Sequence, residues 1–191
     1  MDKREIGKAL MKRSTGIAMI AIIVILGLRA PLFFKPGNLM TVLKQSGVLC
    51  MTAISITTVL IVGGFDMGAG ASVQLVCNLA AGLLISYANP AISWVAGIAV
   101  GALFGLVNAC LVVFVHIPTF VTTLGTMYVM NGVTALYNGG SALAIKSIPG
   151  FTVLTQGNIF GIPIMFIWVV VVCFVMNLFF KRTKTGLRMY A

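Results

Sequence analysis

The chain has 191 residues, of which 60% are hydrophobic and only 8% are charged, and its mean hydropathy is +1.10. Soluble domains carry roughly 25% charged residues, so a soluble fold could not cover its surface with these side chains. The composition therefore indicates an integral membrane protein. The net charge of +10 does not indicate a nucleic-acid partner, because the basic residues cluster at the two chain ends, as they do beside membrane spans.

Six segments are apolar and long enough to cross a membrane, since a hydrocarbon core about 30 Å thick needs about 20 residues of helix. In chain order they are residues 16–34, 47–62, 69–88, 91–115, 119–137 and 162–180. Prolines mark several breaks, because proline disfavours helix in the residue before it. We expect Pro36-Gly37-Asn38 to end the first span. The prediction is an all-α, polytopic membrane helix bundle of about six transmembrane helices.

Lysine and arginine predict the orientation of the bundle. Residues 1–15 and 181–191 are rich in both, as cytoplasmic flanks of membrane spans are. Six spans return the chain to its starting side, so both termini are predicted to be cytoplasmic. Residues 1–15 would then be a basic cytoplasmic tail and residues 16–180 the transmembrane domain. Lys35 and Lys44, in the first predicted connection, are exceptions on the outer side.

The stretch GGFDMGAGAS, residues 63–72, contains Asp66, the acidic residue that lies among the predicted spans. It is surrounded by Gly63, Gly64, Gly68 and Gly70. Each glycine weakens a helix by about 1 kcal/mol relative to alanine, so we expect the backbone to break here. Broken backbone at membrane depth is tolerated only against protein or a water-filled cavity. Two interpretations stay open. In one, the glycines form an elbow that lines a polar space, where Asp66 accepts backbone N–H bonds or faces water. In the other, Asp66 lies in an ordinary solvated turn between two spans. The orientation places this loop on the cytoplasmic side, whereas a re-entrant loop would change that side.

Uncharged polar side chains occur inside the spans. Gln74 and Asn78 lie four residues apart on one helix face. The fifth segment has a threonine face of Thr119, Thr122, Thr123 and Thr126. Such hydroxyls either bond a carbonyl three or four residues earlier and hold helices together, or form the weakly polar wall of a path for an uncharged solute. Gln74 and Asn78 likewise have two interpretations: they form hydrogen bonds between helices, or they line a water-filled route. The candidate pathway residues are Asp66, Gln74, Asn78, Thr122, Thr123 and Thr126.

Small residues recur every four positions along the fourth segment, at Ser93, Gly97, Gly101, Gly105 and Ala109. This ridge predicts close approach of another helix, and Asn108 beside it is expected to bond to that neighbour. The chain has no HExxH, GxxxxGK[ST] or GxSxG motif and no acid–base pair. We therefore predict no catalytic site, no metal site and no cofactor bound by the chain itself.

Three blocks of the sequence resemble permease subunits of bacterial ATP-binding cassette importers for monosaccharides of the ribose, xylose and galactose type. The block ending VGGFDMGAG resembles that family's Gly-Gly-Ile-Asp-Leu-Ser-x-Gly signature, with Met67 and Gly68 in place of Leu-Ser. The block GLVNACLVVFVHIPTFVTTLGTMYVMNG resembles Gly-x-x-Asn-Gly followed by Ile-Pro-x-Phe-x-x-Thr-Leu-Gly-Thr, with Ala109 in place of glycine and Asn131 in place of a common arginine. The positions that match this second block, and the Gly-Gly turn after it, are Asn108, Pro118, Phe120, Thr123, Leu124, Gly125, Thr126, Gly132, Gly139 and Gly140.

The third block, FKRTKTGLRMYA, resembles the start of the family's cytoplasmic coupling region. The resemblance implies that Lys181, Arg182, Thr183 and Gly186 contact an ATPase subunit. Pro118 and Gly125 join the glycines of the elbow and the ridge as hinge or packing residues. Family members continue beyond this region, so we expect the chain to be the N-terminal part of a longer permease.

The resemblance implies a non-enzymatic translocation subunit of the bacterial inner membrane that moves a neutral monosaccharide. Its partners would be an ATPase subunit, which holds ATP and magnesium, an extracytoplasmic sugar-binding protein, a second permease copy and membrane lipid. Two alternatives stay open: a sister permease for nucleosides, a sugar-like signal or branched-chain amino acids, and a membrane scaffold that does not transport.

Overall fold

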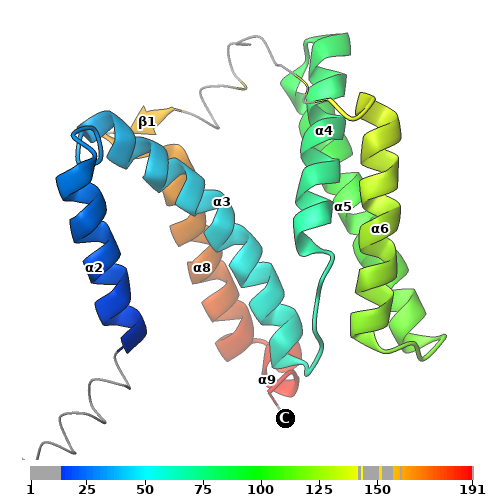
Figure 1. Ribbon diagram of the computed structural model, residues 1–191. Helices are drawn as coiled ribbons and strands as arrows, with labels where there is room; N and C mark the ends of the chain where they lie inside the picture. The colour runs from blue at the N-terminus through cyan, green and yellow to red at the C-terminus, as the bar shows by residue number, and fades with distance from the viewer. Residues whose placement is uncertain (1–13, 142, 144–150, 152–156, 160, 191) are drawn as a thin grey trace, which may run out of the picture. The chain divides into compact units, whose positions relative to one another are not determined.

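The computed structural model describes residues 14–141, 143, 151, 157–159 and 161–190. The predicted basic tail lies almost wholly outside this range. The helices are α2 (Ser14–Arg29), α3 (Pro36–Ile61), α4 (Ala69–Tyr87), α5 (Pro90–Val113), α6 (Thr119–Asn138), α8 (Ile164–Arg182) and α9 (Lys184–Arg188) (Figure 1). Two short strands, β1 (Asn158–Ile159) and β2 (Ile162–Pro163), pair in antiparallel register.

Each of the six predicted segments overlaps one of the helices α2, α3, α4, α5, α6 and α8, so the prediction of an all-α membrane bundle is confirmed. Among the described residues, α3, α4, α5 and α8 are long and apolar enough to cross a membrane. The helix α2 is apolar but has only 16 residues. The number of spans and the sides of the termini remain predictions.

The prediction for the first connection is wrong in its boundaries. Helix α2 ends at Arg29, before Pro36, and Pro36 is the first residue of α3, so Lys44 is helical. Proline suits the first helical position because its fixed φ is already helical and the missing N–H would have no partner there. The Asn38 amide donates to the Phe33 carbonyl at 2.8 Å and fixes the turn before α3.

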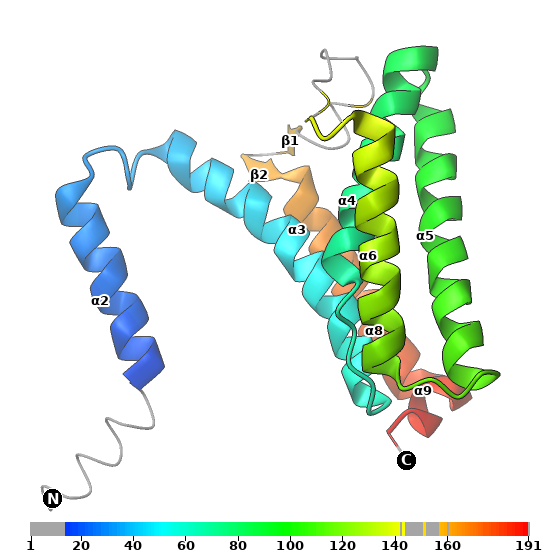
Figure 2. The same cartoon turned by 45° about the vertical axis from the view of Figure 1, so that its right-hand side comes forward.

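The chain divides into two units, residues 1–45 and residues 46–191, and each is described by itself. In the second unit, α4, α5 and α6 pack side by side (Figures 1 and 2). Their core consists of Ala71, Leu75 and Met130, and Phe104 packs against it. Because α5 buries only Ser93 and Gly97, most of its apolar surface faces outward, as it would toward lipid.

Two short connections, between α4 and α5 and between α5 and α6, set the directions of these three helices. The Asn89 side chain accepts a hydrogen bond from Ala91 N at 2.9 Å and caps α5, whose first residue is Pro90. Between α5 and α6, His116 has a φ of 61° and the chain then enters α6 through Pro118. Both connections lie where proline predicted a break, and both make neighbouring helices antiparallel.

In the same unit, α3 and α8 approach each other closely at Gly47. A Cβ atom at this buried glycine would lie 2.6 Å from the Cγ atom of Met165. A larger side chain at Gly47 would therefore force the Met165 side chain of α8 to move.

Candidate functional site

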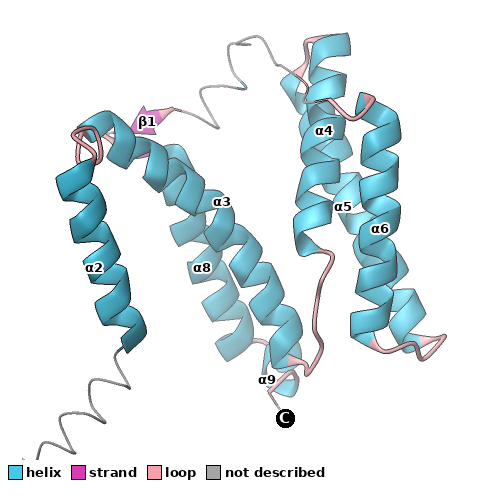
Figure 3. Ribbon diagram, viewed as in Figure 1, coloured by secondary structure: helices cyan, strands magenta, loops and turns pink. Residues whose placement is uncertain are grey.

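The backbone between α3 and α4 is not helical over residues 62–68, as Figure 3 shows in pink. Gly63 has a φ of 79°, which glycine adopts without strain. Gly64 N–H donates back to the Val59 carbonyl at 3.0 Å and closes the end of α3. We call residues 63–68 the elbow.

The Asp66 carboxylate is half-buried and holds the elbow in place. Its Oδ1 atom accepts a hydrogen bond from Gly68 N–H at 2.7 Å, one residue before α4 begins. The first N–H groups of a helix have no partner within the helix, and the positive end of the helix dipole lies here. A carboxylate at this position therefore stabilises the start of α4.

Thr123 joins the elbow to α6. Its hydroxyl oxygen accepts from Met67 N–H at 3.1 Å, and the hydroxyl lies 3.3 Å from the carbonyls of Phe65 and Phe120, to which it can donate. Gly68 lies against the same turn, because a Cβ atom there would lie 3.3 Å from the Thr123 carbonyl. One side chain of α6 thus bonds to backbone on both sides of Asp66.

Thr122 and Thr126 of the threonine face are buried in the packing of α6, as is Thr134 further along the helix, whereas Thr119 is half-buried. Thr122, Thr126 and Thr134 are at most 8% exposed. Thr126 donates to the Thr123 carbonyl and Thr134 to the Met130 carbonyl. The Thr122 hydroxyl is buried and has no hydrogen-bond partner among the described residues. These contacts fit the structural interpretation of the face, in which hydroxyls satisfy backbone carbonyls.

The two predicted amides lie beside a third amide that belongs to the end of α6. Asn138 Nδ2 donates to Asn78 Oδ1 at 3.0 Å, and Asn78 Nδ2 donates to the Gln74 carbonyl at 2.9 Å. Asn138 Oδ1 in turn accepts from Gly140 N–H at 3.0 Å. We call the pocket at this point the amide pocket. Its volume is about 440 Å³, and its lining includes Gln74, Cys77, Asn78, Ala81, Asn138 and Ser141.

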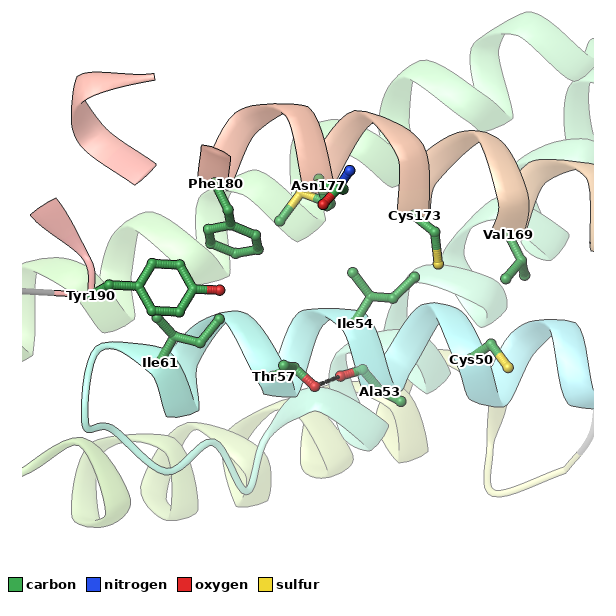
Figure 4. Close-up of a pocket in the computed structure, with 11 residues that line it drawn as sticks. Cys50, Ala53, Ile54, Thr57, Ile61, Val169, Cys173, Asn177, Phe180 and Tyr190 are labelled. Carbon is green, nitrogen blue, oxygen red and sulfur yellow. Dashed lines mark hydrogen bonds between the residues drawn. The ribbon is translucent and has the colours of Figure 1, made fainter. Parts of the chain in front are cut away.

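A second pocket lies between α3 and α8 (Figure 4). Its volume is about 470 Å³, and its walls are mostly apolar. The Thr57 hydroxyl donates to the Ala53 carbonyl of its own helix at 2.7 Å. The rings of Phe180 and Tyr190 meet at a centroid distance of 5.8 Å at one end of the groove. This pocket offers few groups that could hydrogen-bond to a polar solute.

The small-residue ridge of α5 faces α4 along part of its length. Ser93 and Gly97 are buried, and a Cβ atom at Gly97 would lie 3.2 Å from Val76. Gly101 lies further from Val76, at 3.7 Å by the same measure. Gly105 has no atom of another element within 4 Å, so the close approach ends before it.

Three other hinge or packing candidates lie apart from these contacts. Gly70 and Gly125 are exposed helix residues with open space around them. The Asn108 Oδ1 atom is buried without a hydrogen-bond partner among the described residues. The bond that we expected from Asn108 to a neighbouring helix is therefore not made by this oxygen, because no described donor lies within reach.

The four coupling candidates lie at the turn between α8 and α9. Lys181 and Arg182 are the exposed last residues of α8. The Thr183 hydroxyl donates to the Phe179 carbonyl at 2.7 Å and accepts from Gly186 N–H at 3.0 Å. A Cβ atom at Gly186 would lie 2.6 Å from the Cα atom of Phe180 and would clash with the Phe179 carbonyl. Thr183 and Gly186 therefore form the turn itself, and the two basic residues are free to meet solvent or a partner.

Sequence reasoning missed the roles of Asn138 and Ser141. Asn138-Gly139-Gly140 has the composition of a turn, and the structure contains one there, with Gly139 at a φ of 61°. The signal that could have added Asn138 to the pathway candidates is its amide, which occurs at the end of an apolar helix. Its partner Asn78 lies 60 residues earlier, so no local pattern connects the two.

Comparison with known proteins shows the family to which the chain belongs. A family described as branched-chain amino acid transport system / permease component matches residues 38–191. The ribose import permease protein RbsC of Bacillus subtilis is 28% identical over 176 residues, which cover 92% of this chain and 55% of the relative. No solved structure matches the chain.

Two further relatives carry other names. The galactose/methyl galactoside import permease protein MglC of Salmonella typhimurium is 29% identical, over 74% of this chain and 46% of the relative. The autoinducer 2 import system permease protein LsrC of Klebsiella pneumoniae is 34% identical, over 70% of this chain and 40% of the relative. The chain thus spans about half the length of these relatives. Since the family match covers residues 38–191, the chain belongs to the family of branched-chain amino acid transport system permease components.

Proposed function

We propose that this chain forms part of the permease of an ATP-binding cassette importer that moves a neutral monosaccharide. The observation that carries the proposal is the likeness to the ribose import permease, which extends over 92% of the chain. The relatives named for galactoside and autoinducer 2 import support the same solute class. The family match and the four long apolar helices among the described residues make the chain a multi-pass protein of the inner membrane.

The charge distribution favours a neutral solute. Residues 69–138, which contain α4, α5 and α6, have no Asp, Glu, Lys or Arg. A carboxylate or ammonium group buried beside these helices would lose its hydration without gaining a countercharge. Sugar hydroxyls need only hydrogen bonds, and the amides of Gln74 and Asn78 can supply them.

The pathway candidates divide into two roles. We assign direct solute contact to Gln74 and Asn78, because both line a pocket. We assign a positioning role to Asp66 and Thr123, because they hold the elbow between α3 and α4. Thr122 and Thr126 belong with Thr123, since they are buried on the same helix.

The remaining parts of the proposal concern other subunits. ATP and magnesium would be held by a separate ATPase, which would contact the turn at Lys181, Arg182, Thr183 and Gly186. An extracytoplasmic binding protein would deliver the sugar, and a second permease copy would complete the path. The chain itself needs no cofactor and catalyses no reaction.

Uptake by the full-length protein, expressed with the ATPase and binding protein encoded beside it, tests the proposal. Labelled ribose, galactose, leucine and adenosine would be supplied separately to cells that lack their own uptake systems. We expect ATP-dependent uptake of a sugar, and we expect the ATPase to purify with the permease. If no ATPase purifies with the permease, the importer assignment fails, and the alternative of a membrane scaffold that does not transport is favoured.

Leucine is the critical comparison, because the family description names branched-chain amino acid transport. Uptake of leucine without uptake of sugar would mean that the solute of the importer is a zwitterionic amino acid and not a monosaccharide. That result would also require countercharges from helix termini, since residues 69–138 supply none from Asp, Glu, Lys or Arg side chains.

A further inference from the structure

We infer that the amide pocket is the first solute site of the permease, on the outer side of the membrane, and that it binds vicinal hydroxyls of a neutral sugar. This inference rests on the proposed import function and names the place where the solute is recognised. It depends on the position of the pocket, on the unused hydrogen-bonding groups of three amides and on the absence of charge among the described residues that line it.

The first step is the arrangement of the amides. Asn138 is held at both ends, because its Oδ1 accepts from Gly140 N–H and its Nδ2 donates to Asn78 Oδ1. Asn78 is held in the same way, since its Nδ2 donates to the Gln74 carbonyl. Both side chains are therefore fixed before a solute arrives, and a fixed site loses less conformational entropy on binding.

The second step is what the bonds leave unused. An amide side chain has two N–H donors and an oxygen with two lone pairs. Asn78 and Asn138 each use one N–H donor and one oxygen lone pair in these bonds. Each side chain therefore keeps one N–H donor and one lone pair for a solute. The Gln74 side chain makes no hydrogen bond among the described residues. Each sugar hydroxyl both donates and accepts, so adjacent hydroxyls match adjacent amides.

The third step is the rest of the lining. The described residues that line the pocket are uncharged, and Cys77, Ala81 and Leu143 give it apolar surface. A sugar has apolar C–H faces as well as hydroxyls. The apolar residues of the pocket can contact the C–H faces, and the amides can bond to the hydroxyls. The volume of about 440 Å³ lies within the roughly 300–1,000 Å³ of small-molecule sites.

The fourth step is the depth. Asn78 lies nine residues before α4 ends at Tyr87, which is about 13.5 Å along a helix at 1.5 Å per residue. The C-terminal ends of α4 and α6 lie at the same end of the three-helix packing, and the elbow lies at the other (Figure 1). With both termini cytoplasmic, this end faces outward. The pocket is then recessed from the outer surface, where a solute would first meet the permease.

Cys77 provides a probe of the pocket that does not depend on transport. It is an exposed free thiol that lines the amide pocket. In the full-length protein, every cysteine except Cys77 would be replaced by serine, including Cys50, Cys110 and Cys173. A charged, membrane-impermeant methanethiosulfonate reagent reacts only where water reaches the thiolate. Added outside intact cells, it should label Cys77.

Sugar should slow this labelling. At a concentration about ten times the dissociation constant, a ligand that shields the thiol lowers the free fraction, and hence the rate, about tenfold. Ribose and galactose are the probes, and leucine is the comparison that should leave the rate unchanged. A matched protein that retains only Cys173, on α8 in the other pocket, should react at the same rate with and without sugar.

Two substitutions on α4 complete the test. Gln74→Leu should abolish protection by sugar while Cys77 is still labelled, because no described hydrogen bond depends on the Gln74 side chain. Ser86→Ala is the matched control: its hydroxyl bonds the Gly82 carbonyl at 3.0 Å, away from the pocket. Ser86→Ala should leave protection intact.

The outcomes separate the inference from the proposed function. If the protein takes up ribose or galactose but the transported sugar does not slow Cys77 labelling, or Cys77 is never labelled from outside, the amide pocket is not the outer site and import stands. If the protein takes up neither sugar, the proposed function and the inference both fail. Protection that survives Gln74→Leu unchanged would remove that amide from recognition and overturn the three-amide site.

Discussion

At the scale of residues, Asp66 needs its acceptor oxygen more than its charge to hold the start of α4. The hydrogen bond from Gly68 N–H to its carboxylate holds the start of α4. An asparagine oxygen could accept the same bond, whereas alanine could not. An intramolecular hydrogen bond contributes about 0.5–1.5 kcal/mol. We therefore expect Asp66→Ala to lower the melting temperature of the detergent-purified protein, and Asp66→Asn to lower it less.

The charge of Asp66 is tested by transport. We expect Asp66→Asn to reduce sugar uptake more than it reduces the amount of permease in the membrane. The measurement is initial uptake rate divided by membrane protein level, with Asp66→Glu as the variant that keeps the charge. Equal uptake per molecule for Asp66→Asn would mean that the carboxylate belongs to an ordinary solvated turn.

At the scale of elements, Thr123 connects α6 to the elbow. Thr123→Val keeps the shape of the side chain but leaves the Met67 N–H without the partner it has at 3.1 Å. Loss of a partly solvent-exposed hydrogen bond costs about 0.5–1.5 kcal/mol. We expect Thr123→Val to lower the melting temperature, and Thr123→Ser, which keeps the hydroxyl, to stay close to the original.

Thr134→Val is the matched control for this prediction. Thr134 is buried on the same helix, but its hydroxyl bonds only the Met130 carbonyl of α6 itself. Its removal breaks no connection to the elbow. If Thr134→Val destabilises the protein as much as Thr123→Val does, the connection between α6 and the elbow contributes nothing of its own.

The elements could be predicted from sequence where their causes are local. Apolar length located six helices, and the predicted segment 91–115 starts within one residue of α5. Pro36 shows where the local rule is ambiguous, because proline both disfavours helix before it and suits the first position of a new helix. The sequence located the break correctly but assigned Pro36 to the connection instead of to α3.

The candidate site was less predictable, because its contacts join distant segments. Asn78 was a candidate from its spacing with Gln74, but Asn138 meets it across 60 residues. Thr123 reaches the elbow across a similar separation. Periodicity shows that polar side chains share a face of one helix, and it carries no information about which neighbour they meet.

At the scale of the whole molecule, the positions of the amide pocket and the elbow give a test of orientation. Helix α4 has 19 residues, or about 28 Å at 1.5 Å per residue, which is close to the hydrocarbon thickness of about 30 Å. The elbow precedes it, and the C-terminal end of α6 lies near its other end (Figure 1). If α4 crosses the membrane, Met67 and Ser141 should therefore be exposed on opposite sides.

Cysteines introduced at these two positions measure the sides directly. In a cysteine-free background, we expect Ser141→Cys to react with an impermeant reagent added outside, and Met67→Cys to react only after the membrane is permeabilised. Lysine and arginine at the chain ends predict this direction. The opposite pattern would reverse the permease and place the amide pocket on the cytoplasmic side. Labelling of both positions from one side would mean that α4, α5 and α6 together do not carry the chain from one side of the membrane to the other.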